Sequence, residues 1–331
     1  MRYDILILGG GISGQMMAKR LNMEMPKKTI TIVDKQEVKL HPFHLHRPIE
    51  DFPALSNLKS AVLKTNVWNG REIKEQPNLE DINNYSYKIF QCIQITNLYT
   101  QPTIKIYPIS LPQLKAVMEN KASQAIGDVT GIDISQKTTA ITSLNDSLHK
   151  SWCLEYDYLI NTVPLPNFLK LCGLDLSIPF QNFPFYTTML NMNDTNMYQM
   201  IYITDMSNSL TRVTLMNSKL FLESTSATLS KDDYYFINDL YKGIFSAGQS
   251  ISLRKLEPGR FRPIDNNLRK SIFYWLTVRH DIFCLGRYGA WTFKVANDVW
   301  DDTKQIIEWI YAKEQARIFE NIVLKKEKSN V

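Results

Sequence analysis

The stretch DILILGGGISG, residues 4–14, decides the fold, because an apolar run leads directly into glycines at positions 9, 11 and 14. A second apolar run, TITIVD, ends at Asp34. This order of strand, glycine turn, helix and acid is typical of a dinucleotide-binding βαβ unit. Gly9 allows a tight turn, Gly11 lets the backbone approach a pyrophosphate at the helix N-terminus, and Gly14 lets the helix pack closely on the strand. Asp34 is placed to accept hydrogen bonds from a ribose, and its charge disfavours the 2′-phosphate of NADP.

The composition predicts a globular cytoplasmic protein. The 331 residues exceed the usual size of one domain, and a hydrophobic fraction of 44% provides a sizeable core. No apolar run approaches the ~20 residues that cross a bilayer, and no signal peptide is expected. The net charge of +5 suits an anionic ligand and forms no basic stripe of the kind that indicates nucleic-acid binding. The scattered cysteines are expected to be reduced; they are Cys92, Cys153, Cys172 and Cys284.

The remaining pattern predicts one mostly parallel layer and one antiparallel layer. Residues 3–34 form strand, helix and strand, and 36–56 form a loop. Further strands are predicted at 86–95, 102–109, twice within 129–150, at 151–163, four times within 185–225, and at 282–285. Further helices are predicted at 111–121, 231–245, 265–278 and 298–320. The strand at 151–163 should return the chain to the nucleotide-binding sheet.

A second signature lies near the end of the sequence, in DIFCLGRYGAWTFKVANDVWDDTKQIIEWI, residues 281–310. A short strand reaches Gly286 and Arg287, an aromatic loop follows, and Asn297 and Asp298 cap a long helix. The N-terminus of that helix presents free amides and a partial positive charge. In a flavoprotein, such a terminus stabilises the electron-rich pyrimidine edge of the reduced isoalloxazine.

With these motifs, the chain resembles the superfamily of FAD-dependent amine oxidases and UDP-galactopyranose mutases, which also contains protoporphyrinogen oxidase. Four stretches carry the resemblance: GGGISG with Asp34, YDYLINTVPLP (156–166), SLTRVTL (209–215) and GRYGAWTFKVAN (286–297). The last is most similar to the mutase branch. The resemblance implies an α/β fold, in which an FAD-binding Rossmann-like (GR2-type) domain carries a second, antiparallel β-sheet substrate domain. The implied FAD-binding domain is discontinuous, at 1–40, 110–170 and 262–331, and the substrate domain covers 41–109 and 171–261.

The resemblance also implies which residues bind the cofactor, FAD. The ADP half would be held by residues of the first βαβ unit: Gly9, Gly11, Ile12, Ser13, Gly14, Asp34 and Lys35. Gly286 and Arg287 would line the flavin, and the backbone near Val299 and Trp300 would face its pyrimidine edge. No catalytic residue and no metal site is assigned.

Substrate contacts are implied for Arg212, Asn297, Phe293 and His44. Arg212 matches an arginine that contacts the substrate diphosphate in the mutase branch, and its guanidinium suits a carboxylate or phosphate; a solvated strand face is the alternative. Asn297 matches an asparagine of the same site, and Phe293 replaces a tyrosine whose hydroxyl touches the substrate. His44 lies in a cluster with His41 and His46, which either faces the flavin, ligates a metal, or is a polar loop.

The chain departs from the superfamily pattern in two further places; the missing glycine doublet motivates a catalytically silent alternative, and the missing insertion, together with the lost hydroxyl at Phe293, weakens a role in nucleotide-sugar binding. The stretch DKQEVKLHPFHLHRP, residues 34–48, lacks the second glycine doublet usual beside the flavin. The chain is also shorter than typical members, so much of the helical substrate-domain insertion is missing.

The sequence therefore predicts an FAD-dependent oxidoreductase that oxidises an amine C–N bond by hydride transfer to flavin. The alternatives are a non-redox UDP-galactopyranose mutase-type flavoenzyme, a catalytically silent FAD-binding protein, and a flavoenzyme acting on an amine of a nucleic-acid base. The expected partner is a small anionic or amine-bearing substrate, with no membrane involved. The sequence leaves the electron donor or acceptor open.

Overall fold

The computed structural model describes residues 1–35, 44–95, 98, 103–143, 151–174, 176–193, 195–241, 251, 253–255 and 259–329. The chain divides into two compact units. Unit 1 comprises Met1–Leu58, Pro108–Pro179 and Pro263–Val331, and unit 2 comprises Lys59–Tyr107 and Phe180–Arg262. Residues 44–58 and 171–179 thus lie in unit 1, whereas the sequence placed them with the substrate domain.

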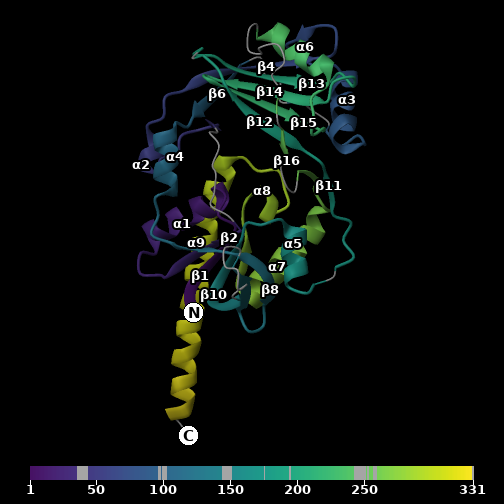
Figure 1. The fold of residues 1–331 in the computed structure, drawn as a ribbon. Helices are drawn as coiled ribbons and strands as arrows, with labels where there is room; N and C mark the ends of the chain where they lie inside the picture. Colours follow the sequence, from purple (N-terminus) through teal and green to yellow (C-terminus); the bar gives the residue numbers. More distant parts are fainter. Residues whose placement is uncertain are drawn as a thin grey trace. The chain divides into compact units, whose positions relative to one another are not determined.

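Unit 1 is built on a mostly parallel sheet with the strand order β7-β2-β1-β10-β9-β8, in which β18 also pairs with β10 (Figure 1). Strands β7, β2, β1, β10 and β18 run parallel; β9 runs antiparallel to β10, and β8 runs antiparallel to β9. The strands of this sheet are β1 (Arg2–Leu8), β2 (Ile30–Asp34), β7 (Ser123–Ile126), β8 (Asp128–Asp133), β9 (Thr138–Thr142), β10 (Ser151–Asn161) and β18 (Ile282–Cys284). The short strand β3 (His44–Leu45) is not part of this sheet. The predicted return of β10 to the nucleotide-binding sheet is confirmed.

The helices of unit 1 are α1 (Ile12–Glu24), α2 (Pro53–Ser56), α4 (Leu111–Met118), α5 (Leu165–Leu171), α7 (Asn266–His280), α8 (Gly286–Gly289) and α9 (Ala296–Ser329). Strand β1 is buried on both faces from Ile5 to Leu8, as expected for a central parallel strand. Helix α1 packs against α9, where buried Arg20 donates to Thr303 and stacks 4.1 Å above the ring of Trp300. The last turns of α9 continue past the sheet (Figure 1).

A buried acid fastens α9 to the sheet. Asp281 follows α7 in a left-handed conformation and accepts bonds from Lys137 and Arg317 at Oδ2 (2.5 and 2.6 Å) and an ion pair from Lys313 at Oδ1 (2.7 Å). Burial raises the pKa of the Asp281 carboxyl, but the hydrogen bonds and charges of the two lysines outweigh it, so the pKa lies below its usual value. The ionised carboxylate therefore holds three cations together.

Unit 2 is built on a sheet that continues from β16 through β12, β15, β14, β13 and β4 to β6. Its strands are β4 (Ala61–Trp68), β5 (Ile73–Lys74), β6 (Thr103–Pro108), β12 (Tyr186–Asn191), β13 (Tyr198–Ile203), β14 (Leu210–Met216), β15 (Lys219–Ser224) and β16 (Arg254–Lys255). Strands β11 (Gln181–Phe183) and β17 (Arg260–Arg262) pair with each other in a separate two-stranded sheet. The four predicted strands within 185–225 are confirmed. The sheet is mixed rather than purely antiparallel, because β4 pairs with β13 in parallel.

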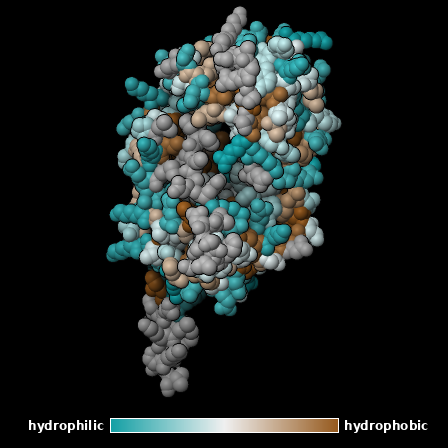
Figure 2. Space-filling view, in the orientation of Figure 1, coloured by the Kyte–Doolittle hydropathy of each residue, from teal (hydrophilic) through white to brown (hydrophobic). Residues whose placement is uncertain are grey.

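Two helices cover opposite faces of this sheet, α3 (Leu79–Phe90) and α6 (Lys231–Leu240). Residues of α3 pack with Met200 and Tyr202 of β13, whereas Ile237 of α6 packs with Ile203 of the same strand. Since alternate residues of a strand point to opposite faces, the two clusters lie on either side. On the face of the molecule shown in Figure 2, hydrophobic residues form small groups among hydrophilic ones.

The strand predicted at 86–95 is wrong, because α3 occupies the first half of that stretch and the described residues after it form no strand. Asn78 and Asp81 form a reciprocal capping box at the start of α3, and Gln91 ends it in a left-handed conformation. Tyr85, Ile89 and Phe90 are buried at helical spacing. Capping and tertiary burial thus override the β-forming run YKIFQCI.

Candidate nucleotide site

The glycine turn after β1 has the backbone that its sequence predicts. Gly9 has φ +95°, and its carbonyl oxygen accepts a hydrogen bond from the Thr162 hydroxyl (3.1 Å). A Cβ on Gly14 would lie 2.0 Å from the Gly9 carbonyl oxygen, so only glycine lets α1 approach the turn this closely. Space around Gly11 is open, since a Cβ there meets no atom within 4 Å.

The N-terminus of α1 is free to receive an anion. Its N-cap residue, Gly11, provides no side-chain hydrogen bond, and the first turn, which begins at Ile12, carries no acidic residue. The first amides of a helix have no acceptor within the helix and carry a partial positive charge. This end of α1 can therefore bind a phosphate group.

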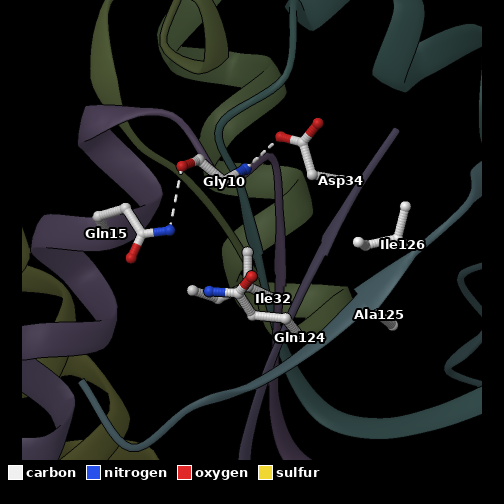
Figure 3. Close-up of a pocket in the computed structure, with 7 residues that line it drawn as sticks. All are labelled: Gly10, Gln15, Ile32, Asp34, Gln124, Ala125 and Ile126. Carbon is white, nitrogen blue, oxygen red and sulfur yellow. Dashed lines mark hydrogen bonds between the residues drawn. The ribbon is translucent and has the colours of Figure 1, made fainter. Parts of the chain in front are cut away.

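Asp34 connects the end of β2 to the glycine turn (Figure 3). Its Oδ2 accepts a hydrogen bond from the Gly10 amide at 2.6 Å. On the other side of Gly10, buried Gln15 donates to the carbonyl oxygen (3.1 Å) and accepts from Asn120 (2.8 Å). A cavity of about 10 Å³ lies here, between these residues and β7. The sequence analysis did not identify Gln15 or Asn120; the only local signal was a polar residue beside Met16 and Met17.

The C-terminal signature meets the glycine turn. Gly286 has φ +79°, and a Cβ there would lie 2.2 Å from the Ser13 hydroxyl. Gly289 lies as closely against the end of β10, because its Cβ would be 2.4 Å from the Asn161 carbonyl oxygen. The segments that follow β1, β10 and β18 thus converge at the carboxyl edge of the parallel sheet, the edge at which open α/β sheets bind ligands.

The aromatic loop after Gly286 lies against Arg287. The guanidinium is centred 5.1 Å from the Phe293 ring, and Phe293 is 51% exposed. Trp291 is buried and has φ +47°, an uncommon conformation for a bulky residue. Arg287 and Phe293, predicted at cofactor and substrate, are therefore neighbours on one loop, and the short helix α8 replaces the start of the predicted loop.

Asn297 fixes the segment that contains two of the histidines. Its Oδ1 accepts from the His46 amide (2.8 Å), and its Nδ2 donates to the Arg47 carbonyl oxygen (2.9 Å). The rings of His44 and His46 are 5.5 Å apart. His41 lies outside the described residues, and among those that the structure describes no cluster of three or more His, Cys, Asp or Glu could hold a metal.

The resemblance implies that the backbone near Val299 and Trp300 faces the flavin, and the start of α9 differs from this expectation at the Val299 amide. The Val299 amide donates to the Val295 carbonyl oxygen (3.1 Å), so the amides without a helical acceptor lie earlier, before Val299. The Trp300 side chain is buried and donates to Asp51 (2.7 Å). Lys35, expected near the adenosine, forms an ion pair with Asp128 (2.8 Å).

Arg212 lies on β14 of unit 2, and it is not on a solvated strand face. Glu223 pairs with Arg212 at 2.5 Å through Oε1 and with Arg260 at 3.0 Å through Oε2. The Nε atoms of both arginines are buried without a hydrogen-bond partner. Burial lowers the pKa of Arg212, but Glu223 outweighs it and the net pKa is raised. Two guanidiniums around one carboxylate leave an excess positive charge.

No helix within the described ranges is long and apolar enough to cross a membrane. The sequence matches no protein-family model and no curated protein. Solved structures, in contrast, resemble the chain over nearly its whole length. A reduced UDP-galactopyranose mutase is 15% identical with a TM-score of 0.63, and the match covers 94% of each chain.

Two further structures show the same likeness. A protein from Exiguobacterium sp. 255-15 assigned as a protoporphyrinogen oxidase is 11% identical with a TM-score of 0.61, over 94% of this chain and 99% of that one. A flavoprotein/dehydrogenase from Cytophaga hutchinsonii is 13% identical with a TM-score of 0.54, over 94% and 79%. The predicted fold class is confirmed: the chain has the Rossmann-type α/β fold of these flavoproteins, with a second sheet unit.

Proposed function

We propose that this chain is an FAD-dependent oxidoreductase. The observation that carries the proposal is the convergence of the Gly9–Gly14 turn, Asp34 and the Gly286 turn at the carboxyl edge of one parallel sheet. The two signatures come from opposite ends of the sequence, and Gly286 approaches Ser13 so closely that no other residue fits. A nucleotide turn alone would not require the C-terminal segment to close against it.

The residues at this edge fit FAD. The α1 amides would bind the pyrophosphate, Asp34 would orient the adenosine ribose, and the first amides of α9 would face the pyrimidine edge. Bound FAD would supply a two-electron acceptor for a hydride. The protein would hold the substrate carbon against the flavin and exclude water.

We further propose that the substrate is an amine. Its carbon next to nitrogen would give a hydride to the flavin, and the resulting iminium ion would lose a proton to water and become an imine. A neutral amine needs no strong base for this step. The sequence supplies no obvious acid–base pair beside the two signatures, which agrees with a reaction that needs no strong base.

The first test is the colour of the purified protein. We expect a yellow protein with the two-band visible absorbance of oxidised flavin, and heat treatment should release FAD as identified by chromatography against FMN and NAD. Anaerobic addition of primary and secondary amines should bleach the long-wavelength band. A colourless protein that takes up no FAD would overturn the cofactor assignment, whereas FAD that no amine bleaches would overturn only the amine assignment.

A second candidate is non-redox mutase chemistry. The excess positive charge of Arg212 and Arg260 around Glu223 supports it. The likeness to a UDP-galactopyranose mutase adds to it. UDP-galactose should then perturb the flavin spectrum and amines should not. Arg212→Lys loses the planar bidentate fork of the guanidinium. This variant should need an about tenfold higher UDP-galactose concentration to reach half of the spectral change.

Two outcomes would select the remaining alternatives. Flavin that dithionite reduces, but that turns over with no donor in a broad panel, would indicate a catalytically silent FAD-binding protein. Salt-sensitive retention on immobilised DNA would indicate an amine on a nucleic-acid base as the substrate, because phosphate contacts weaken as salt rises.

A further inference from the structure

A second cavity, of about 450 Å³, lies wholly within unit 2. One wall is a face of α6, with Asp232, Tyr235, Phe236 and Asp239 at helical spacing. The opposite wall contains Trp68 at the end of β4 and the loop from Asp205 to Asn208. The volume is in the range of small-molecule sites.

The lining of this cavity is acidic. Asp205, Asp232 and Asp239 contribute carboxylates, and no lysine or arginine is among its described lining residues. Burial raises the pKa of Asp205, but hydrogen bonds from Ser207 and Asn208 outweigh it, so the carboxylate stays ionised. The Lys88 ammonium lies behind the loop, where it donates to the Asp205 carbonyl oxygen (2.6 Å), and burial lowers its pKa to about 8. Of the three cavity acids, Asp205 therefore has a partly balancing cation nearby.

The cavity also offers aromatic surface. The rings of Trp68 and Phe236 are 5.2 Å apart, and Tyr235 is 72% exposed. Aromatic faces attract cations, and the attraction grows where water is excluded. Carboxylates and aromatic rings in one cavity therefore favour an organic cation over Ca²⁺ or Mg²⁺, which prefer oxygen ligands alone.

An unpartnered acceptor points to the same ligand. Asn208 is only 6% exposed; its amide nitrogen donates to Asp205 Oδ2 (2.6 Å), but its Oδ1 has no hydrogen-bond partner. A buried carbonyl oxygen without a donor is destabilising, and a ligand N–H would satisfy it after a small rotation of the Asn208 side chain, because this oxygen has almost no accessible surface in the structure.

We propose that this cavity binds a small organic cation with an N–H donor, such as a primary alkylammonium, between the Asp232–Asp239 face of α6 and the Trp68–Asn208 wall. The ammonium would lie among the three carboxylates and donate to Asn208 Oδ1, while its alkyl group contacts Phe236 and Trp68. This inference does not depend on flavin binding.

The test is a titration of the intact protein with n-butylammonium, followed by NMR saturation transfer and calorimetry. We expect n-butylammonium to bind about tenfold or more tightly than 1-butanol or butyrate, because only the first carries a positive charge. Tetramethylammonium, which has no N–H, should bind several-fold more weakly than n-butylammonium. Equal binding of n-butylammonium and 1-butanol, or no binding of the cation, would overturn the proposal.

Variants locate the site. Asp232→Asn combined with Asp239→Asn should weaken n-butylammonium binding about tenfold, and Tyr235→Ala by a few-fold. Glu80→Gln is the matched control, because Glu80 and Asp232 are each the exposed second residue of a helix in unit 2, and Glu80 does not line the cavity. Thermal melts report whether the variants are folded. If the control weakens binding as much as the double variant, the effect is one of general charge and the assignment fails.

Discussion

Gly11→Ala should weaken FAD binding about 10- to 100-fold while leaving the apoprotein nearly as stable as the wild type. The methyl group meets no atom within 4 Å in the structure, and Gly11 has φ −63°, which alanine adopts readily. The same methyl group would stand where the pyrophosphate approaches α1, so one charge-assisted hydrogen bond of about 1.5–3 kcal/mol would be lost. The stability cost should be that of a less favourable N-cap, within about 1 kcal/mol.

Gly14→Ala is the contrasting variant. Its methyl group would lie 2.0 Å from the Gly9 carbonyl oxygen, so α1 must move away from the turn. We expect a loss of more than about 3 kcal/mol in the free energy of unfolding, measured by urea denaturation of both apoproteins. FAD titrations of apo Gly11→Ala complete the pair. Wild-type FAD affinity in Gly11→Ala would show that no pyrophosphate lies at the α1 N-terminus.

Asp281→Asn should destabilise unit 1 by about 2–3 kcal/mol at pH 7. The side chain of Asp281 is 11% exposed, and its removal leaves the charges of Lys137, Lys313 and Arg317 facing one another. Breaking a fully buried ion pair costs about 3–5 kcal/mol, and partial exposure of the three cations reduces this figure. Urea unfolding followed by circular dichroism measures the loss, with Asp128→Asn as a surface control expected within about 0.5 kcal/mol of wild type.

The pH dependence of this difference follows from the pKa of Asp281. The folded-state pKa lies below the usual value, so the stabilisation is fully present above the unfolded pKa of about 4 and is lost as the pH falls through the folded value. The stability difference between wild type and Asp281→Asn should therefore shrink below about pH 4. A difference that is absent at pH 7, or that grows in acid, would show that Asp281 does not hold the cluster together.

The parts of the fold that the sequence predicted are those with local signals. The strand, glycine turn and helix of residues 2–24 follow from an apolar run and glycine spacing within a few residues of each other. Likewise, alternation within 185–225 predicted four strands, and the apolar run before Thr162 predicted β10. Each of these patterns reports burial of the element itself, which does not require knowledge of distant residues.

What the sequence did not predict depends on partners far along the chain. Gln15 is held by Asn120, and Asn297 by the backbone of His46 and Arg47. Neither pairing leaves a periodic trace in the sequence. The run YKIFQCI was assigned to a strand because its residues favour strands. In the structure, the capping box at Asn78 and the packing of α3 stabilise a helix over its first residues instead. The acidic cavity was missed for the same reason, since its walls come from three separate segments.

The contact between Gly286 and Ser13 has a consequence for biosynthesis. On the ribosome, the glycine turn emerges first, and the segment around Gly286 that packs against it is translated long afterwards. Until then, β1 can pair with β2 and β10, yet the ligand-binding edge lacks one wall. Cofactor capture should therefore be a post-translational event, and nascent chains arrested before Gly286 should expose an incomplete nucleotide cradle to chaperones.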